Sequence, residues 1–142
     1  MPKTILLPVD LSDEESWKKP LAAALEQVRL HDGVLHVVSV LPDFGMSVVG
    51  GYFSPNFERD ALHNFGTALS DWVAANIPGD VEIRPHVLHG SIYDEILRAA
   101  DKVEADLIVM GAHRPELRDY LLGPNAARVV RHARQSVYVV RA

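Results

Sequence analysis

Short apolar runs alternate along the chain with longer segments in which apolar residues recur every three or four positions. The runs at residues 4–9, 34–41 and 106–110 are almost wholly apolar, which is typical of parallel strands covered on both faces. The segment over 57–75 carries its apolar residues at helical spacing instead. The pattern therefore predicts strands that alternate with helices.

The first predicted helix follows the strand that leads to Asp10. Ser12 with Glu15 three residues later has the form of a capping box, in which side chains pair with the free main-chain N–H groups of a helix start. Pro20 lies inside the apolar pattern that follows. Because proline removes a helical hydrogen bond, we expect a helix that is kinked or begins late, and that ends near residues 32–33.

Proline and serine mark the later elements. Pro85 within the run 81–88 cannot donate to a strand ladder, which predicts an edge strand. Ser91 with Asp94 predicts a second helix cap. The remaining predicted elements are helices over 92–103 and 125–134 and strands over 106–110 and 136–141.

This alternation predicts an α/β, Rossmann-like fold: a doubly wound five-stranded parallel sheet with helices on both faces. With the third strand at an edge and the first strand central, the expected strand order is 3-2-1-4-5. Ligands of such folds bind beyond the carboxyl ends of the strands, where the strand order reverses. That point lies between the first and fourth strands, which end at Asp10 and Gly111. By length, the 142 residues make one domain.

Composition narrows the classes of function. A formal net charge of -5 argues against nonspecific binding to nucleic acid or to an anionic membrane surface. The absence of cysteine excludes disulfides, thiolate zinc sites and cysteine nucleophiles. The start of the chain has too short an apolar run for a signal peptide, and no apolar stretch approaches the roughly 18 residues of a membrane span. We expect a cytoplasmic protein.

The loop over 111–123 is the main candidate for a ligand-binding site. A glycine-bearing turn before a helix start can hold a phosphate on free N–H groups, although turn geometry alone also explains its glycines. His86 and His89 lie three apart in one predicted strand and so point to opposite faces, and we predict no protein metal site. His113 has no paired nucleophile or orienting carboxylate at a recognisable spacing, so no catalytic residue is predicted.

Four stretches together resemble the universal stress protein family. They are ILLPVDLS at 5–12, LHVVSV at 35–40, HGSIYDEILRAADKVEADLIVMG at 89–111 and LLGPNAARVVRHARQSVYVV at 121–140. The pattern HRPELRDYLLGPNAARVVRHA is similar to a small bacterial branch in which the glycine loop reads His-Arg-Pro. The resemblance implies a dimeric regulatory factor of stress adaptation that binds an adenine nucleotide, ATP, ADP or AMP, with Mg²⁺ accompanying the phosphates.

The resemblance also implies which residues meet the nucleotide. Pro8 and Asp10 match positions beside the adenine and ribose, and Val37 matches a strand residue whose main chain meets adenine. The loop glycines and the last helix start match ribose and phosphate positions. The full expected set is Pro8, Val9, Asp10, Val37, Gly111, Arg114, Gly123, Asn125 and Ala126.

The glycine loop departs from the usual family pattern of Gly, two residues, Gly, nine residues, Gly, and then Ser or Thr. Arg114 occupies the second glycine position, eight residues precede Gly123, and Pro124 replaces the hydroxyl residue. Pro124 supplies neither an N–H nor a hydroxyl, although the N–H groups of Asn125 and Ala126 stay free. Arg114 either clamps a phosphate or fills space. Two alternatives therefore remain open: a nucleotide-independent dimeric interaction module, or a slow ATP-hydrolysing enzyme.

The last predicted strand indicates how the protein associates with a second copy. SVYVVR at 136–141 reads as an apolar edge strand, and such edges are usually covered. Pairing with a twofold mate would cover this one, and the family resemblance implies the same homodimer. The preceding helix is basic, which we attribute to cations that complement the dipole at its carboxyl end rather than to a nucleic-acid surface.

Overall fold

The structure, a computed structural model, describes residues 3–42, 57–112 and 124–141. Strands and helices alternate along the chain, as the sequence predicts. The elements are β1 (Thr4–Pro8), α1 (Glu14–His31), β2 (Val34–Pro42), α3 (Phe57–Asn76), β3 (Glu82–Gly90), α4 (Ile92–Lys102), β4 (Leu107–Gly111), α5 (Pro124–His132) and β5 (Ser136–Val140).

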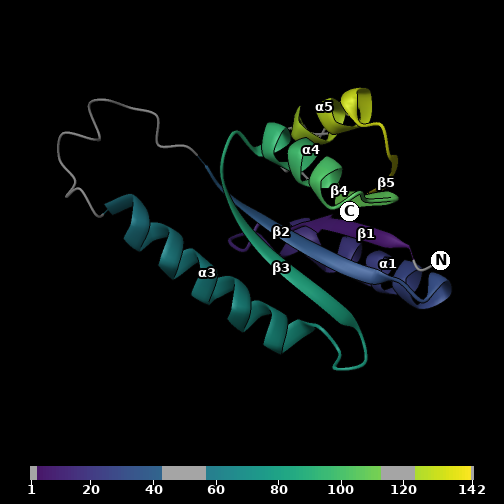
Figure 1. Ribbon diagram of the computed structural model, residues 1–142, viewed down its shortest axis with the longest axis horizontal. Helices are drawn as coiled ribbons and strands as arrows, with labels where there is room; N and C mark the ends of the chain where they lie inside the picture. Colours follow the sequence, from purple (N-terminus) through teal and green to yellow (C-terminus); the bar gives the residue numbers. More distant parts are fainter. Residues whose placement is uncertain (1–2, 43–56, 113–123, 142) are drawn as a thin grey trace.

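The five strands form one parallel sheet in the order β3-β2-β1-β4-β5, which confirms the predicted topology (Figure 1). Strand β1 is central and pairs with β2 on one side and β4 on the other. Strand β3, which contains Pro85, lies at an edge as predicted, because proline is tolerated where one side of a strand needs no donor. The strand order therefore reverses between β1 and β4.

A separate hydrophobic cluster packs on each face of the sheet, with α1 and α3 on one face and α4 and α5 on the other (Figure 1). Alternation along β1 separates the two sets: Ile5 and Leu7 face α1 and α3, whereas Leu6 faces α4 and α5. All three are fully buried. The apolar runs of the sequence thus reflect strands that are covered on both sides.

The start of α1 differs from the prediction. The helix begins at Glu14, ahead of Pro20, so the late start is wrong, and Pro20 lies buried inside the helix. The predicted capping box is also wrong. Ser12 does not cap the helix, because its hydroxyl donates to the Asp10 carboxylate instead. The N-cap residue is Asp13, and its side chain makes no cap hydrogen bond.

The later helices follow the sequence more closely. Ser91 is the N-cap residue of α4, as predicted, although its side chain makes no cap hydrogen bond. Helix α4 ends at Lys102 and α5 ends at His132, within two residues of the expected bounds. Among the helices of the described ranges, none combines the length and the apolar character that a membrane crossing needs.

Two histidines from neighbouring strands meet on the α4 face of the sheet. His36 of β2 lies diagonally across from His86 of β3, whose register partner is Val38. Nδ1 of His36 is 2.8 Å from Nε2 of His86, and the two rings are stacked with centroids 5.1 Å apart and planes 10° from parallel. One ring nitrogen donates and the other accepts, so this hydrogen bond requires at least one neutral ring.

This pair makes stability depend on pH. Burial lowers the pKa of His36 below its usual 6.5, and the charges of His86 and Arg84 lower it further, against Glu82, which raises it. Burial and then Lys102 lower the pKa of His86. As the pH falls below 6.5, these two histidines therefore take up protons more readily in the unfolded chain than in the folded chain, which lowers the free energy of unfolding. We expect the urea concentration at the midpoint of unfolding to be constant above pH 6.5 and to decrease as the pH falls below that value.

The control for this prediction is a variant without the pair. The fall in the urea midpoint below pH 6.5 should become smaller in His36→Gln and stay unchanged in His132→Gln, because His132 is exposed on α5. An identical pH profile in the wild type and in His36→Gln would contradict the assignment.

Candidate functional site

A pocket of about 320 Å³ opens at the carboxyl ends of β1, β2 and β4, where the strand order reverses. Elements from both faces of the sheet contribute to it, which is the arrangement expected of a ligand site in a doubly wound fold. Most of its lining side chains are apolar, and its polar groups gather around the end of β1. The lining residues are Pro8, Val9, Asp10, Ser12, Asp13, Ser16, Val38, Ser39, Val40, Phe65, Ile92, Ile96, Met110, Gly111, Ala112, Asn125 and Ala126.

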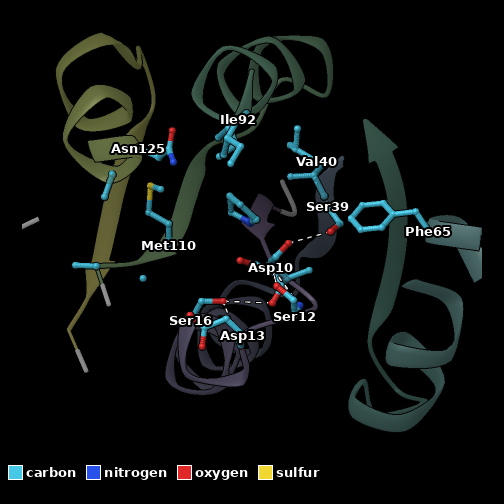
Figure 2. A pocket seen from close by; sticks show the side chains of 17 residues that line it. Asp10, Ser12, Asp13, Ser16, Ser39, Val40, Phe65, Ile92, Met110 and Asn125 are labelled. Atoms are coloured by element: carbon cyan, nitrogen blue, oxygen red, sulfur yellow. Dashed lines mark hydrogen bonds between the residues drawn. The ribbon is translucent and has the colours of Figure 1, made fainter. Parts of the chain in front are cut away.

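The polar side of the pocket is the turn that joins β1 to α1 (Figure 2). One carboxylate oxygen of Asp10 accepts hydrogen bonds from the main-chain N–H of Ser12, at 3.0 Å, and from its hydroxyl, at 2.6 Å. The Ser16 hydroxyl donates to the carbonyl of Asp13 at 2.6 Å. The two bonds from Ser12 hold the Asp10 side chain at the pocket and leave its second carboxylate oxygen as an acceptor for a ligand hydroxyl.

The end of β1 is fixed to β2 by the main chain of Val9. Its N–H donates to the carbonyl of Val38 at 2.9 Å, and its carbonyl accepts the hydroxyl of Ser39 at 3.0 Å. Ser39 is only 1% exposed, so this hydroxyl is a buried group that is satisfied within the protein. The N–H of Val9 is therefore occupied, and its carbonyl already accepts one hydrogen bond.

Strand β2 continues past the end of β1 and leaves a main-chain edge facing the pocket. The β1–β2 register ends at Pro8 opposite Val38, whereas β3 accompanies β2 as far as Gly90. Main-chain groups alternate in direction along a strand, and those of Val38 point to β1, so those of Val40 point the same way. Within the described residues no strand lies beside Val40 there. Val40 thus presents one N–H donor and one C=O acceptor toward the cavity.

Gly111 lines the pocket because no side chain fits where β4 crosses α1. A Cβ atom on Gly111 would lie 2.7 Å from the carbonyl oxygen of Ser16 and 3.1 Å from Cγ of Pro20. In a regular helix the Ser16 carbonyl would accept the N–H of residue 20, which proline lacks. This glycine therefore serves the close approach of α1 to β4, a reason that the loop pattern in the sequence did not reveal.

The side of the pocket opposite Asp10 is formed by α4 and α5 (Figure 2). Ile92 and Ile96 contribute apolar side chains from the first turns of α4. Asn125 and Ala126 come from the first turn of α5, whose early N–H groups have no partner within the helix and carry partial positive charge. The pocket thus has an apolar middle between a carboxylate and a helix start.

The predicted site residues divide into three groups. Six of them line the pocket: Pro8, Val9, Asp10, Gly111, Asn125 and Ala126. Val37 does not line it, because its side chain is fully buried among the residues that face α1 and α3, and its register partners are Leu7 and Pro85 on either side. Arg114 and Gly123 lie outside the described residues, as do the other residues of the predicted loop from 113 to 123.

Sequence reasoning missed the pocket residues that come from other elements. Val40 is three positions from Val37 in the same strand, and only the length of β1 relative to β2 distinguishes their surroundings. Phe65 lies on α3 and Ile92 on α4, where helical periodicity marks them only as apolar. The seryl hydroxyl of Ser16 gave no signal apart from its place in the first helix.

Comparison with known proteins decides the family. The sequence model of the Universal stress protein family matches residues 1–141. This chain belongs to the universal stress protein family. Universal stress protein G of Salmonella typhimurium is 34% identical over 143 residues, which cover 99% of this chain and 100% of that protein.

Solved universal stress proteins share its fold. The universal stress protein UspA from Lactobacillus plantarum aligns with a TM-score of 0.75 at 23% identity, covering 98% of this chain and 97% of that one. The universal stress protein from Archaeoglobus fulgidus in complex with dAMP aligns with a TM-score of 0.63 at 25% identity, covering 96% of both chains. The present universal stress protein is therefore similar to its relatives over nearly its whole length.

Proposed function

We propose that this universal stress protein binds an adenine nucleotide, ATP, ADP or AMP, in the pocket between β1 and β4. One observation carries the proposal: the open main-chain edge of Val40 and the carboxylate of Asp10 face the same largely apolar cavity. The relative from Archaeoglobus fulgidus in complex with dAMP supports the choice of an adenylate. The protein acts, in this proposal, as a cytoplasmic regulatory factor in stress adaptation.

The pocket has the groups that an adenine ring needs. A purine is flat and apolar on its faces, which suits the side chains of Ile92, Ile96 and Met110. Its edge carries a donor next to an acceptor, and Val40 offers the complementary pair on its main chain. At about 320 Å³ the cavity is within the range of small-molecule sites.

The polar ends of the pocket suit the rest of the nucleotide. The free oxygen of Asp10 can accept a ribose hydroxyl, as acids at strand ends do in dinucleotide folds. Phosphates belong at the start of α5, near Asn125 and Ala126, where N–H groups and the helix dipole favour anions. Contacts of Arg114 and Gly123 with the phosphates stay predictions. The Mg²⁺ that the family resemblance implies beside the phosphates also stays a prediction.

The experiment that tests this function separates it from the two alternatives. The purified protein is denatured, released small molecules are identified by mass spectrometry, and nucleotide-free protein is titrated with AMP and ATP by calorimetry. Binding of one adenylate per chain supports the proposal. No released nucleotide and no binding heat would favour a nucleotide-independent interaction module, and steady ADP production that disappears in Asp10→Ala would favour a slow ATPase.

We further propose that the protein is a homodimer formed through residues 136–141. Strand β5 pairs only with β4 among the described strands, and Tyr138 on it is exposed. An edge strand of this kind can pair with its own copy about a twofold axis. Light scattering should give twice the chain mass of 15.7 kDa. The substitution Val139→Pro should shift the protein toward the monomer, because proline removes a main-chain N–H donor from the strand.

A further inference from the structure

The His36 and His86 side chains form a second chemical site, which does not belong to the nucleotide pocket. Neither residue lines that pocket, although the partner of His86 in the strand register, Val38, does. Both imidazoles are half-buried, so the sheet fixes their positions while solvent still reaches them. Their facing nitrogens, Nδ1 of His36 and Nε2 of His86, are 2.8 Å apart.

That separation is the one that two nitrogens adopt on a shared metal ion. At the metal–nitrogen length of about 2.0–2.1 Å known for zinc, two nitrogens at the right angle of a square-planar Cu²⁺ or Ni²⁺ site lie about 2.9 Å apart, and at the tetrahedral angle of zinc about 3.3 Å apart. The two rings are already nearly parallel, with planes 10° apart. In the hydrogen bond the facing nitrogens point along the line that joins them, so each ring has to turn by roughly 45° to aim its lone pair at a metal ion held at a right angle.

We propose that His36 and His86 form a chelating site for a late first-row transition metal ion. Imidazole is a ligand of Cu²⁺, Ni²⁺ and Zn²⁺, and affinity in this series is highest for Cu²⁺. Among the described residues no cluster of three or more His, Cys, Asp or Glu side chains could hold a metal. The protein therefore supplies two ligands, and water completes the coordination.

The charges around the pair select the kind of metal. Arg84 and Lys102 bring positive charge near the rings, and Glu82 brings negative charge. The Glu82 carboxylate lies 3.2 Å from the Arg84 guanidinium, and both side chains are more than half exposed, so neither charge dominates the site. Mg²⁺ and Ca²⁺, which bind through carboxylate oxygens, gain nothing here. The positive charge of Lys102 opposes every cation, so only ions with a high intrinsic affinity for neutral nitrogen are expected to bind.

Both rings are neutral, as metal binding requires, although one of them carries its proton on the facing nitrogen. Burial and neighbouring charges lower the pKa of each ring, so both are neutral near pH 7.5. The metal takes a lone pair from each facing nitrogen. The proton that the rings share in the free protein moves through solvent to the other nitrogen of the ring that carried it. Both imidazoles stay neutral, and no net proton is released.

The test uses tag-free protein that has been stripped with EDTA, dialysed and titrated with CuCl₂ at pH 7.5. Calorimetry should find a first site of one Cu²⁺ per chain, and electron paramagnetic resonance should show two equatorial nitrogens. His36→Gln and His86→Gln should each weaken this site at least about tenfold, the scale on which even outer-shell changes alter metal affinity. Ni²⁺ and Zn²⁺ should bind the same site more weakly.

The matched control is His132→Gln, which removes an exposed histidine from α5 and should leave the first site unchanged. Circular dichroism of each glutamine variant shows whether the fold is retained. Equal Cu²⁺ affinity in the wild type and in both folded variants would overturn the proposal, as would a wild-type protein without a one-to-one site. Loss of the first site at pH 5 in the wild type and in His132→Gln would support it, because protons then compete for the same nitrogens.

Discussion

Replacement of Gly111 by alanine is expected to lower the free energy of unfolding by about 1–3 kcal/mol, the usual cost of overpacking a well-packed core. The added Cβ would lie 2.7 Å from the Ser16 carbonyl, a main-chain group that cannot turn aside. Helix α1 or strand β4 has to move, and both border the pocket. We therefore expect weaker adenylate binding together with a lower urea midpoint.

Gly79→Ala is the matched control for this prediction. No atom lies within 4 Å of the position that its Cβ would take, so the same chemical change should leave the urea midpoint almost unchanged. Equal midpoints for Gly111→Ala and Gly79→Ala would show that α1 and β4 are not in the close contact described above.

Replacement of Asp10 by alanine is expected to weaken adenylate binding by about 10- to 100-fold. A hydrogen bond to a charged group contributes about 1.5–3 kcal/mol, and every 1.4 kcal/mol corresponds to tenfold in affinity. The carboxylate is held at the pocket by Ser12 and has one oxygen without a bond to that residue. Calorimetric titration with AMP measures the effect.

Ser12→Ala distinguishes loss of the carboxylate from loss of its support. This variant removes the 2.6 Å hydroxyl contact but keeps the acid, so its affinity should fall much less than that of Asp10→Ala. If Asp10→Ala binds AMP as tightly as the wild type does, the ribose is not at Asp10, and the orientation proposed for the nucleotide is wrong.

Sequence reasoning succeeded where a single element decides the outcome. The apolar runs around Leu6 and Ile108 predicted buried parallel strands, and Pro85 predicted the edge position of β3, because each pattern expresses a local constraint. These constraints were sufficient for the strand order and for the crevice between β1 and β4. Asp10, two residues after the end of β1, and Gly111, the last residue of β4, line the pocket at that crevice, and their contact with a nucleotide stays a prediction.

Reasoning from the sequence was insufficient where the surroundings of a residue depend on how two elements lie against each other. The sequence pointed to Val37, whereas Val40 lines the pocket, because the sequence does not show that β1 ends opposite Val38, two residues before Val40. His86 was compared only with His89 in its own strand, whereas its partner, His36, comes from β2. The start of α1 was misplaced because Ser12 bonds to Asp10 and not to the helix.

The most direct test of the nucleotide site is a titration of ¹⁵N-labelled, nucleotide-free protein with AMP, followed by amide NMR. The account predicts the largest shifts at Val40, Gly111 and Asn125, from three different elements that border the pocket, with little change at Arg84 on the edge strand. A protein whose amides do not respond to AMP, or respond only away from these three residues, would contradict it.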